Sequence, residues 1–438
     1  MTRIAIIGAG ISGLGAAWAL RDRADVTLFE KDDRLGGHAC THSFNLGGMP
    51  VNVDLGFIVY NGLNYPNLIG FFEALKVETE ASDMSFSVTD PEGWTWASTA
   101  AGIFAQKRNL LSPRFHKFWT TILKFNDTAR RDLASGRIDD PSLGAWLDRH
   151  GFDADFRANY ILPMGAAIWS TPEDRILDYP ARSFFQFFDN HRLMHKERPK
   201  WRTVTGGSQN YVRKAGDALG GRVRLNSPIA RVHPFGGKIA VVPESGRPEV
   251  FDEVILTCHS DQALRLVEQD YEAPAFYLRS VKYRPNTIYL HCDPALMPAR
   301  KAAWASWNVL KQPGGDICLT YWMNKLQNIA PQVPVFITLN PATPPAPDLI
   351  LHRYSFDHPQ FDAAAEAAVR SLGRIQGQDG LWFAGAWMGR GFHEDGLKSG
   401  LAAALSLGGE VPWETKSVDL IVRRRNTSDY EVKAEATA

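Results

Sequence analysis

The chain has 438 residues, and its 48 lysines and arginines are balanced by 48 aspartates and glutamates, so its formal net charge is zero. A neutral chain without a basic run offers no electrostatic reason to expect nucleic-acid binding. The length exceeds one typical domain and predicts two folded units. The four cysteines form no C-x-x-C pair, which indicates free thiols in a reducing cytoplasm. No stretch reaches the ~20 apolar residues of a membrane span, so we expect a cytoplasmic protein.

The N-terminal segment reads as a dinucleotide-binding unit. Residues 4–7 form an apolar run suited to a buried parallel strand, and residues 14–20 predict a helix. Between them, Gly8, Gly10 and Gly13 form a G-x-G-x-x-G turn. These glycines permit a tight turn, a close approach of the backbone to a pyrophosphate, and close packing of helix on strand. The N-terminus of the helix offers free N–H groups and a partial positive charge to the phosphates.

An acidic residue follows the second predicted strand, residues 26–29. Glu30 lies 17 residues after Gly13, where a carboxylate can bond the ribose hydroxyls and would repel a 2′-phosphate. The spacing therefore argues against NADP. Residues 31–37 then read KDDRLGG, with an arginine and a second glycine pair.

This stretch resembles the E-x-x-x-R-x-G-G extension of FAD-dependent oxidoreductases, especially the superfamily of amine oxidases, phytoene desaturases and protoporphyrinogen oxidases. The resemblance implies FAD, with Arg34 and the pair Gly36 and Gly37 adding phosphate contacts. The family pattern usually continues with an arginine, where this chain has His38. That departure weakens one expected phosphate contact.

Further matches to the superfamily are spread along the chain. Residues 51–57 (VNVDLGF) resemble a D-x-G strand whose following backbone reaches the flavin, and Ile229 lies where the family's backbone contacts adenine. Residues 381–400 resemble the closing motif, whose glycines approach the ribityl phosphate and the flavin. The cofactor-binding residues implied by these matches are Gly8, Gly10, Ser12, Gly13, Glu30, Lys31, Arg34, Gly36, Gly37, His38, Gly56, Phe57, Ile58, Ile229, Gly385, Asp395 and Gly396.

The order of these matches predicts a discontinuous architecture. We expect an α/β fold in which a Rossmann-like FAD-binding domain of the GR2 type carries an inserted α+β substrate domain. The FAD-binding domain is expected from residues 1–85, 200–265 and 375–415, and the substrate domain from residues 86–199 and 266–374. Residues 416–438 read as a polar C-terminal tail.

The sequence gives less direct information on the reaction than on the cofactor. Amine oxidases of the superfamily commonly carry a lysine near flavin N5, and the corresponding stretch, residues 280–291, places Asn286 there, with Lys282 on a different register. The closing motif contains no cysteine, so FAD is expected to be non-covalent. His393 and Tyr60 are candidates for a base, but packing roles are favoured for both, and no catalytic residue is assigned.

Metal binding is not expected either. The one close histidine pair, His191 and His195 with Asp189 nearby, lacks an evident third ligand.

A narrower resemblance bears on the substrate. Residues 167–194 and 201–212 look like a bacterial flavoprotein group associated with cyclopropane-fatty-acid-synthase-type methyltransferases, a domain also fused ahead of plant cyclopropane synthases. Some members are implicated in desaturating methyl-branched fatty acyl chains. The resemblance implies a lipid substrate, FAD-dependent dehydrogenation and a methyltransferase partner. The alternatives are a flavin amine oxidase releasing hydrogen peroxide, a redox-inactive flavoprotein partner of a lipid-modifying enzyme, and a flavin-dependent isomerase.

Two aromatic segments leave alternatives open. A helical stripe at residues 115–125, flanked by basic residues, either faces the core or contacts the inner face of an anionic membrane, with the core reading favoured. Four phenylalanines within residues 184–188 either line a tunnel or fill the core, and core filling is again favoured.

Overall fold

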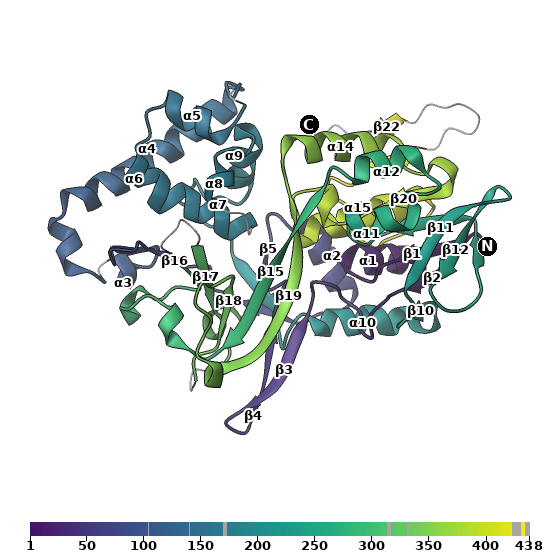
Figure 1. Ribbon diagram of the computed structural model, residues 1–438, viewed down its shortest axis with the longest axis horizontal. Coiled ribbons are helices and arrows are strands. Elements are labelled where there is room, and N and C mark those ends of the chain that lie inside the picture. Colours follow the sequence, from purple (N-terminus) through teal and green to yellow (C-terminus); the bar gives the residue numbers. More distant parts are fainter. Residues whose placement is uncertain are drawn as a thin grey trace.

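The computed structural model describes residues 1–103, 105–139, 141–169, 173–312, 317–330, 333–422 and 431–433. Two lobes lie side by side, with the N-terminus on the first of them (Figure 1). Most of the predicted polar tail lies outside the described residues.

The first lobe is built on a five-stranded parallel sheet assembled from three distant parts of the chain. Apolar residues fill both faces of these strands, as expected for a parallel sheet with helices on its two sides. In spatial order the strands are β10 (Val223–Arg224), β2 (Asp25–Phe29), β1 (Arg3–Ile7), β14 (Glu253–Leu256) and β20 (Leu381–Phe383). The three segments expected for FAD binding each contribute to this sheet, and the domain boundaries themselves stay a prediction.

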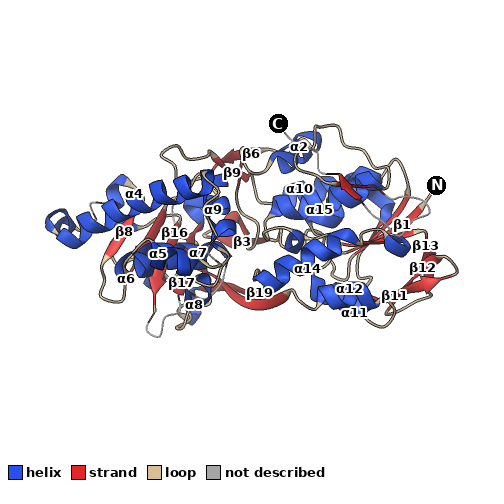
Figure 2. Cartoon of the chain, turned by 90° about the horizontal axis from the view of Figure 1, so that it is seen from above, coloured by secondary structure: helices blue, strands red, loops and turns tan. Residues whose placement is uncertain are grey.

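Alternate residues of β1 point into two separate cores. Ile4 and Ile6 pack with one set of helices, and Ala5 and Ile7 pack with the other. Figure 2 shows α10 and α15 on one side of the lobe and α11, α12 and α14 on the other. The first set is α1 (Ile11–Leu20), α2 (Pro66–Ala74), α10 (Gln209–Leu219) and α15 (His393–Ser406); the second is α11 (Ser260–Val267), α12 (Glu272–Leu278) and α14 (Ala363–Arg374).

Smaller antiparallel sheets accompany the parallel sheet. One consists of β11 (Ile229–Phe235), β12 (Lys238–Pro243) and β13 (Glu249–Phe251), and its residues join the core of the second helix set. Another is the hairpin β3 (Thr41–Leu46) and β4 (Met49–Asp54), whose buried Val51 and Val53 pack in the core of the other lobe. In the third, β9 (Trp201–Val204) is the central strand and pairs with β5 (Tyr60–Asn61) and with β6 (Thr79–Ala81).

The second lobe combines a seven-stranded sheet with a group of helices. Two long strands of this sheet, β15 and β19, run side by side toward the first lobe (Figure 1). In order the strands are β19 (Ile350–Gln360), β15 (Lys282–His291), β18 (Phe336–Leu339), β17 (Ile317–Trp322), β16 (Trp307–Lys311), β7 (Phe86–Thr89) and β8 (Thr95–Ala97). The principal helices are α4 (Pro113–Ala134), α5 (Leu143–Arg149), α7 (Leu162–Trp169) and α9 (Ala181–Asn190).

Both aromatic segments belong to the core of the second lobe. In α4, Phe118 and Phe125 are buried, while Lys117 and Lys124 are exposed on the opposite face. All four phenylalanines of α9 are buried in the same cluster. The α4 stripe therefore faces the core and not a membrane, and the phenylalanines of α9 fill the core, where Phe187 also borders a cavity. Among the described residues, no helix is both long and apolar enough to cross a bilayer.

Candidate functional site

The first glycine turn joins β1 to α1 and opens onto free space. Gly8 has a φ of +108°, which disfavours any other residue. A Cβ at Gly13 would lie 1.9 Å from the carbonyl oxygen of Gly8, so only glycine permits this packing of helix on strand. A Cβ at Gly10, by contrast, would meet no atom within 4 Å. Space for a ligand therefore adjoins the N-terminus of α1.

Glu30 directly follows β2 and holds the same turn. Its buried carboxylate accepts hydrogen bonds from the backbone N–H of Ala9 at 2.7 Å and of Asp32 at 3.1 Å. Ile229 begins β11 close by, because the N–H of Ser227 donates to the carbonyl of Glu30 at 2.8 Å. Lys31 is exposed beside them. The structure thus brings Glu30 and the start of β11 together at one end of the turn.

The second glycine pair packs directly on the first turn. The N–H of Gly36 donates to the carbonyl of Ala9 at 2.8 Å, and a Cβ at Gly37 would lie 3.2 Å from the Cα of Gly10. Arg34 donates to the carbonyl of Gly37 and to the hydroxyl of Tyr354, each at 3.0 Å. The guanidinium thereby joins this loop to β19 of the second lobe.

The closing segment brings a second helix N-terminus to the same place. A Cβ at Gly396 would lie 2.8 Å from Ile11 and 3.1 Å from the hydroxyl of Ser12, so α15 packs on the first turn of α1. Gly385, just after β20, donates its N–H to Ser399 at 2.9 Å. Two helix N-termini side by side create a favourable environment for an anion such as a phosphate.

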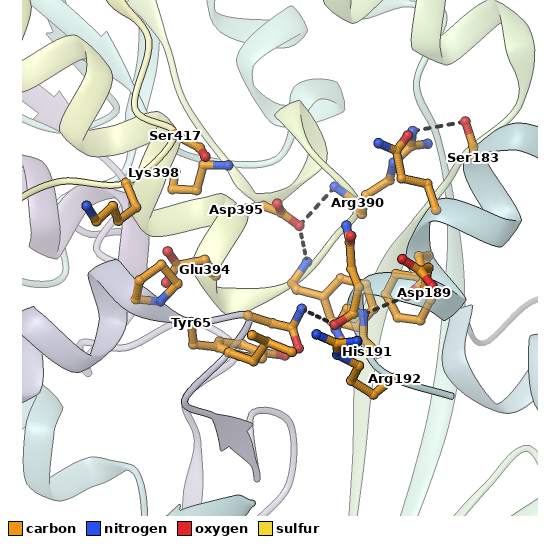
Figure 3. Close-up of a pocket in the computed structure, with 18 residues that line it drawn as sticks. Tyr65, Ser183, Asp189, His191, Arg192, Arg390, Glu394, Asp395, Lys398 and Ser417 are labelled. Atoms are coloured by element: carbon orange, nitrogen blue, oxygen red, sulfur yellow. Dashed lines mark hydrogen bonds between the residues drawn. The ribbon is translucent and has the colours of Figure 1, made fainter. Parts of the chain in front are cut away.

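Asp395 shapes this segment through its own loop. Its carboxylate accepts from the backbone N–H of Arg390 at 2.9 Å and of Phe392 at 3.1 Å, as the dashed lines in Figure 3 show. Burial raises the pKa of Asp395, and these two donors oppose that shift. The neighbouring Glu394 accepts three hydrogen bonds at the N-terminus of α2. The side chains of both carboxylates are therefore engaged with protein donors.

The remaining predicted residues converge where the first lobe meets β19. A Cβ at Gly56 would lie 2.2 Å from the carbonyl of His38, and the N–H of Phe57 donates to that carbonyl at 2.9 Å. The ring of His38 stacks on Phe356 of β19, with centroids 4.5 Å apart. The carbonyl of Ile58 accepts from Thr203 at 2.8 Å. We call this meeting point, formed by His38, Gly56 and Phe57 of the first lobe and Phe356 of β19, the junction.

His393 belongs to the junction, whereas Tyr60 does not. His393 stacks on Phe57 with centroids 3.8 Å apart, and its Nε2 lies 2.6 Å from the hydroxyl of Tyr211. Burial lowers the pKa of His393 to about 3 and raises that of Tyr211, so the phenol keeps its proton and donates to the neutral imidazole. Tyr60 is buried against Phe72 of α2, which supports the packing role.

Asp54 links three segments beneath the junction. Its fully buried carboxylate accepts from the N–H of Ser208 at 2.9 Å, from the hydroxyls of Ser208 and Thr41, and from the amide of Gln327 at 2.7 Å. Burial raises its pKa to about 6 despite these donors. The role of Asp54 is to hold the D-x-G turn against α10 and the second lobe.

Sequence reasoning missed two histidines at the junction. His259 precedes α11 and His358 lies on β19, and both rings face His38, with centroids 5.5 and 5.6 Å away. Asn286 is fully buried on β15 and donates to His358 at 2.7 Å. Lys282 is exposed at the start of β15 and donates to the carbonyl of Arg279, so it does not substitute for Asn286. No local motif marks these histidines, because each comes from a different chain segment.

A cavity of about 560 Å³ lies beside the closing segment, between the N-terminus of α2 and the end of α9 (Figure 3). Asp189 is bonded to His195 at 2.6 Å, and His191 stacks on Phe187. Within the described residues, no group of three histidines, cysteines or acids is placed to hold a metal ion. The lining residues are Leu63, Asn64, Tyr65, Pro66, Ser183, Gln186, Phe187, Asp189, Asn190, His191, Arg192, Arg390, Phe392, Glu394, Asp395, Lys398, Lys416 and Ser417.

Residues 11–327 match the family of flavin-containing amine oxidoreductases, and the chain belongs to this family. It is 25% identical over 320 residues to tryptophan 2-monooxygenase of Pseudomonas savastanoi, covering 64% of this chain and 56% of that protein. The chain therefore spans about half the length of the curated relatives it matches. The predicted superfamily is confirmed, and FAD is the cofactor of this family.

Solved structures show the same fold at low sequence identity. Putrescine oxidase bound to putrescine superposes with a TM-score of 0.69 at 15% identity, covering 93% of this chain and 98% of that one. A fatty acid isomerase from P. acnes that produces CLA superposes with a TM-score of 0.63 at 15% identity, covering 91% and 97%. The predicted fold class is confirmed. Because the fold serves both proteins, it does not select a substrate.

Proposed function

We propose that this chain is an FAD-dependent oxidoreductase that dehydrogenates a lipid, in particular a modified fatty acyl chain. When bound, FAD supplies the hydride acceptor at flavin N5. The protein orients the substrate carbon and excludes water. The narrower sequence likeness supports a partner protein, a methyltransferase that acts on the same lipid.

The glycine turns support a cofactor bound in an extended conformation across the first lobe. The open space at Gly10 and the paired N-termini of α1 and α15 suit the pyrophosphate. Glu30 suits the ribose, and the start of β11 at Ile229 suits the adenine. The other end of the cofactor then reaches the junction. We propose a non-covalent flavin, because residues 381–400 contain no cysteine.

The observation that carries the substrate assignment is the group of neutral histidines that share the junction. A cationic amine is favoured by a nearby carboxylate, and Asp54, Glu394 and Asp395 each already accept two or more hydrogen bonds from protein donors. Asp261 and Asp357 are the carboxylates that act on His259. The histidines around the junction are neutral, because burial lowers the pKa of His38, His259, His358 and His393. Because these four side chains carry no charge, they favour an uncharged C–H substrate over an ammonium group.

The second candidate is oxidation of an amine or an amino acid. The names of tryptophan 2-monooxygenase and putrescine oxidase favour it, as does Asp189 in the cavity wall. This reaction would release hydrogen peroxide when oxygen reoxidises the flavin.

Anaerobic flavin reduction separates the two candidates. Purified holoprotein is mixed with fatty acyl substrates, with putrescine and with tryptophan, and the visible flavin absorption is followed. Bleaching by the acyl substrates alone is the expected result, whereas bleaching by an amine alone would refute the lipid assignment. Lipid mass spectra of cells with the protein, without it, or with the Gly10→Ala variant provide the second measurement. The expected difference is acyl unsaturation that appears only with the unmodified protein.

A further inference from the structure

Two asparagines and a histidine form a hydrogen-bonded relay from the end of β18 across β15 to β19. The Oδ1 of Asn340 accepts from the backbone N–H of Thr287 at 2.9 Å. The Nδ2 of Asn340 donates to the Oδ1 of Asn286 at 2.7 Å. The Nδ2 of Asn286 in turn donates to the Nδ1 of His358 at 2.7 Å. The relay therefore runs from a backbone amide to one nitrogen of an imidazole.

The backbone amide sets the direction of every bond in the relay. The N–H of Thr287 can only donate, so the oxygen of Asn340 must face it and the NH₂ of Asn340 must face Asn286. The oxygen of Asn286 is then occupied, and its NH₂ faces His358. The same NH₂ lies 3.2 Å from the carbonyl of Arg284, which fits only a donor. Nδ1 of His358 is consequently the acceptor, and the ring proton lies on Nε2.

The relay also opposes protonation of His358. A second ring proton would place Nδ1–H against the NH₂ of Asn286, and the amide cannot rotate without breaking its bond to Asn340. Burial and the nearby His259 act in the same direction, while Asp357 opposes them, and the pKa of His358 is lowered to about 4. The other groups around the ring are His38 and, opposite His358 on β15, Arg284. Within the described part of the chain, Nε2 has no hydrogen-bond partner.

We propose that Asn286 and Asn340 are positioning residues that hold His358 as a neutral Nε2–H donor at the junction. The link to the flavin rests on the proposed function, which brings the flavin ring to this point. An uncharged donor of fixed orientation stabilises negative charge that develops nearby, and it does so without a lysine cation. The hydrogen-bond lock itself depends only on residues of this chain.

Two near-isosteric variants test the lock. In Asn286→Asp, the carboxylate accepts from His358, so the ring proton moves to Nδ1 and the imidazolium becomes favoured. In Asn340→Asp, both oxygens accept, so Asn286 must turn its NH₂ toward residue 340 and its oxygen toward His358. Asn45→Asp, on the exposed part of β3, is the matched control because it makes the same charge change outside the relay.

The readout is the tautomer of His358, observed by NMR of protein with ¹⁵N-labelled histidine and assigned with His358→Gln. We expect Nε2–H from about pH 6 to 9 in the unmodified protein and in the control, and Nδ1–H or imidazolium in the two relay variants. An Nδ1–H or charged His358 in the unmodified protein would overturn the proposal, as would an unchanged tautomer in both variants.

The flavin reduction potential of the holoprotein is the second readout. In Asn286→Asp its dependence on pH should differ from that of the unmodified protein because of the new titration of His358, and an unchanged pH profile would overturn the link to the flavin. The NMR measurement needs neither flavin nor lipid. The expected tautomer of His358 without lipid oxidation would therefore refute the proposed function but not the proposal that Asn286 and Asn340 hold this tautomer.

Discussion

Alanine substitutions at Gly10 and Gly13 test whether the space beside each glycine is open to a ligand or filled by the protein. Gly10 has φ −71° and ψ −174°, which alanine adopts without strain, and its added Cβ meets no atom within 4 Å. Gly10→Ala should therefore change the free energy of unfolding of the FAD-free protein by no more than about 0.5 kcal/mol. At Gly13 the added Cβ would lie 1.9 Å from a carbonyl oxygen and 2.8 Å from Thr257. Gly13→Ala should cost about 1–3 kcal/mol or more, because backbone must move.

Gly10→Ala should have little effect on stability but a large effect on FAD affinity. If the open space holds the pyrophosphate, the new methyl group intrudes on it at an overpacking cost of about 1–3 kcal/mol. That cost corresponds to a Kd raised roughly 5- to 150-fold. Urea unfolding of the FAD-free proteins measures stability, and quenching of flavin fluorescence measures Kd. Gly10→Ala protein with unchanged affinity would refute the pyrophosphate placement, and destabilisation equal to that of Gly13→Ala would refute the open space.

Three further substitutions test other contacts. Tyr211→Phe leaves the Nε2 of His393 unpaired and should lower the free energy of unfolding by about 1–3 kcal/mol in urea; unchanged stability would mean that the bond is absent. His291 is fully buried with a pKa lowered to about 4, so the unfolded chain gains this proton first and stability falls between about pH 6.5 and pH 4. In His291→Gln, the slope of unfolding free energy against pH in that window should be smaller by about 1.4 kcal/mol per unit, and an equal slope would contradict the shift. Trp413→Ala removes a half-buried ring whose centroid lies 5.6 Å from that of Trp18, so it should lower the free energy of unfolding by about 2 kcal/mol in urea or thermal unfolding. Unchanged stability would mean that this segment is not packed on α1.

Much of the local structure around the first turn was predictable. Residues 4–7 were expected as a strand and form most of β1, because a short apolar run that ends at a glycine turn is typical of a buried strand. The strand expected at residues 51–57 ends earlier, at Asp54. The reason is tertiary: the carboxylate of Asp54 is held by Ser208 and Gln327, and the chain then turns at Gly56 against the carbonyl of His38.

The aromatic stripe of α4 illustrates a question that periodicity cannot answer. A helical spacing of apolar residues shows that one face is buried, but the same spacing suits a bilayer or a protein core. Only contacts such as that between Phe125 and Trp146, with ring centroids 5.8 Å apart, decide for the core.

The amino-acid sequence alone established the glycine turn and the acidic residue after β2, because each depends on backbone constraints within a short segment. The order of the family-like segments along the chain established the fold class. Tertiary structure decided which distant side chains share the junction. His38, His259 and His358 come from three separate segments, and the tautomer of His358 follows from Thr287 through two asparagines. Hydrogen bonds of this kind depend on strand register, and residue spacing along the chain does not encode that register.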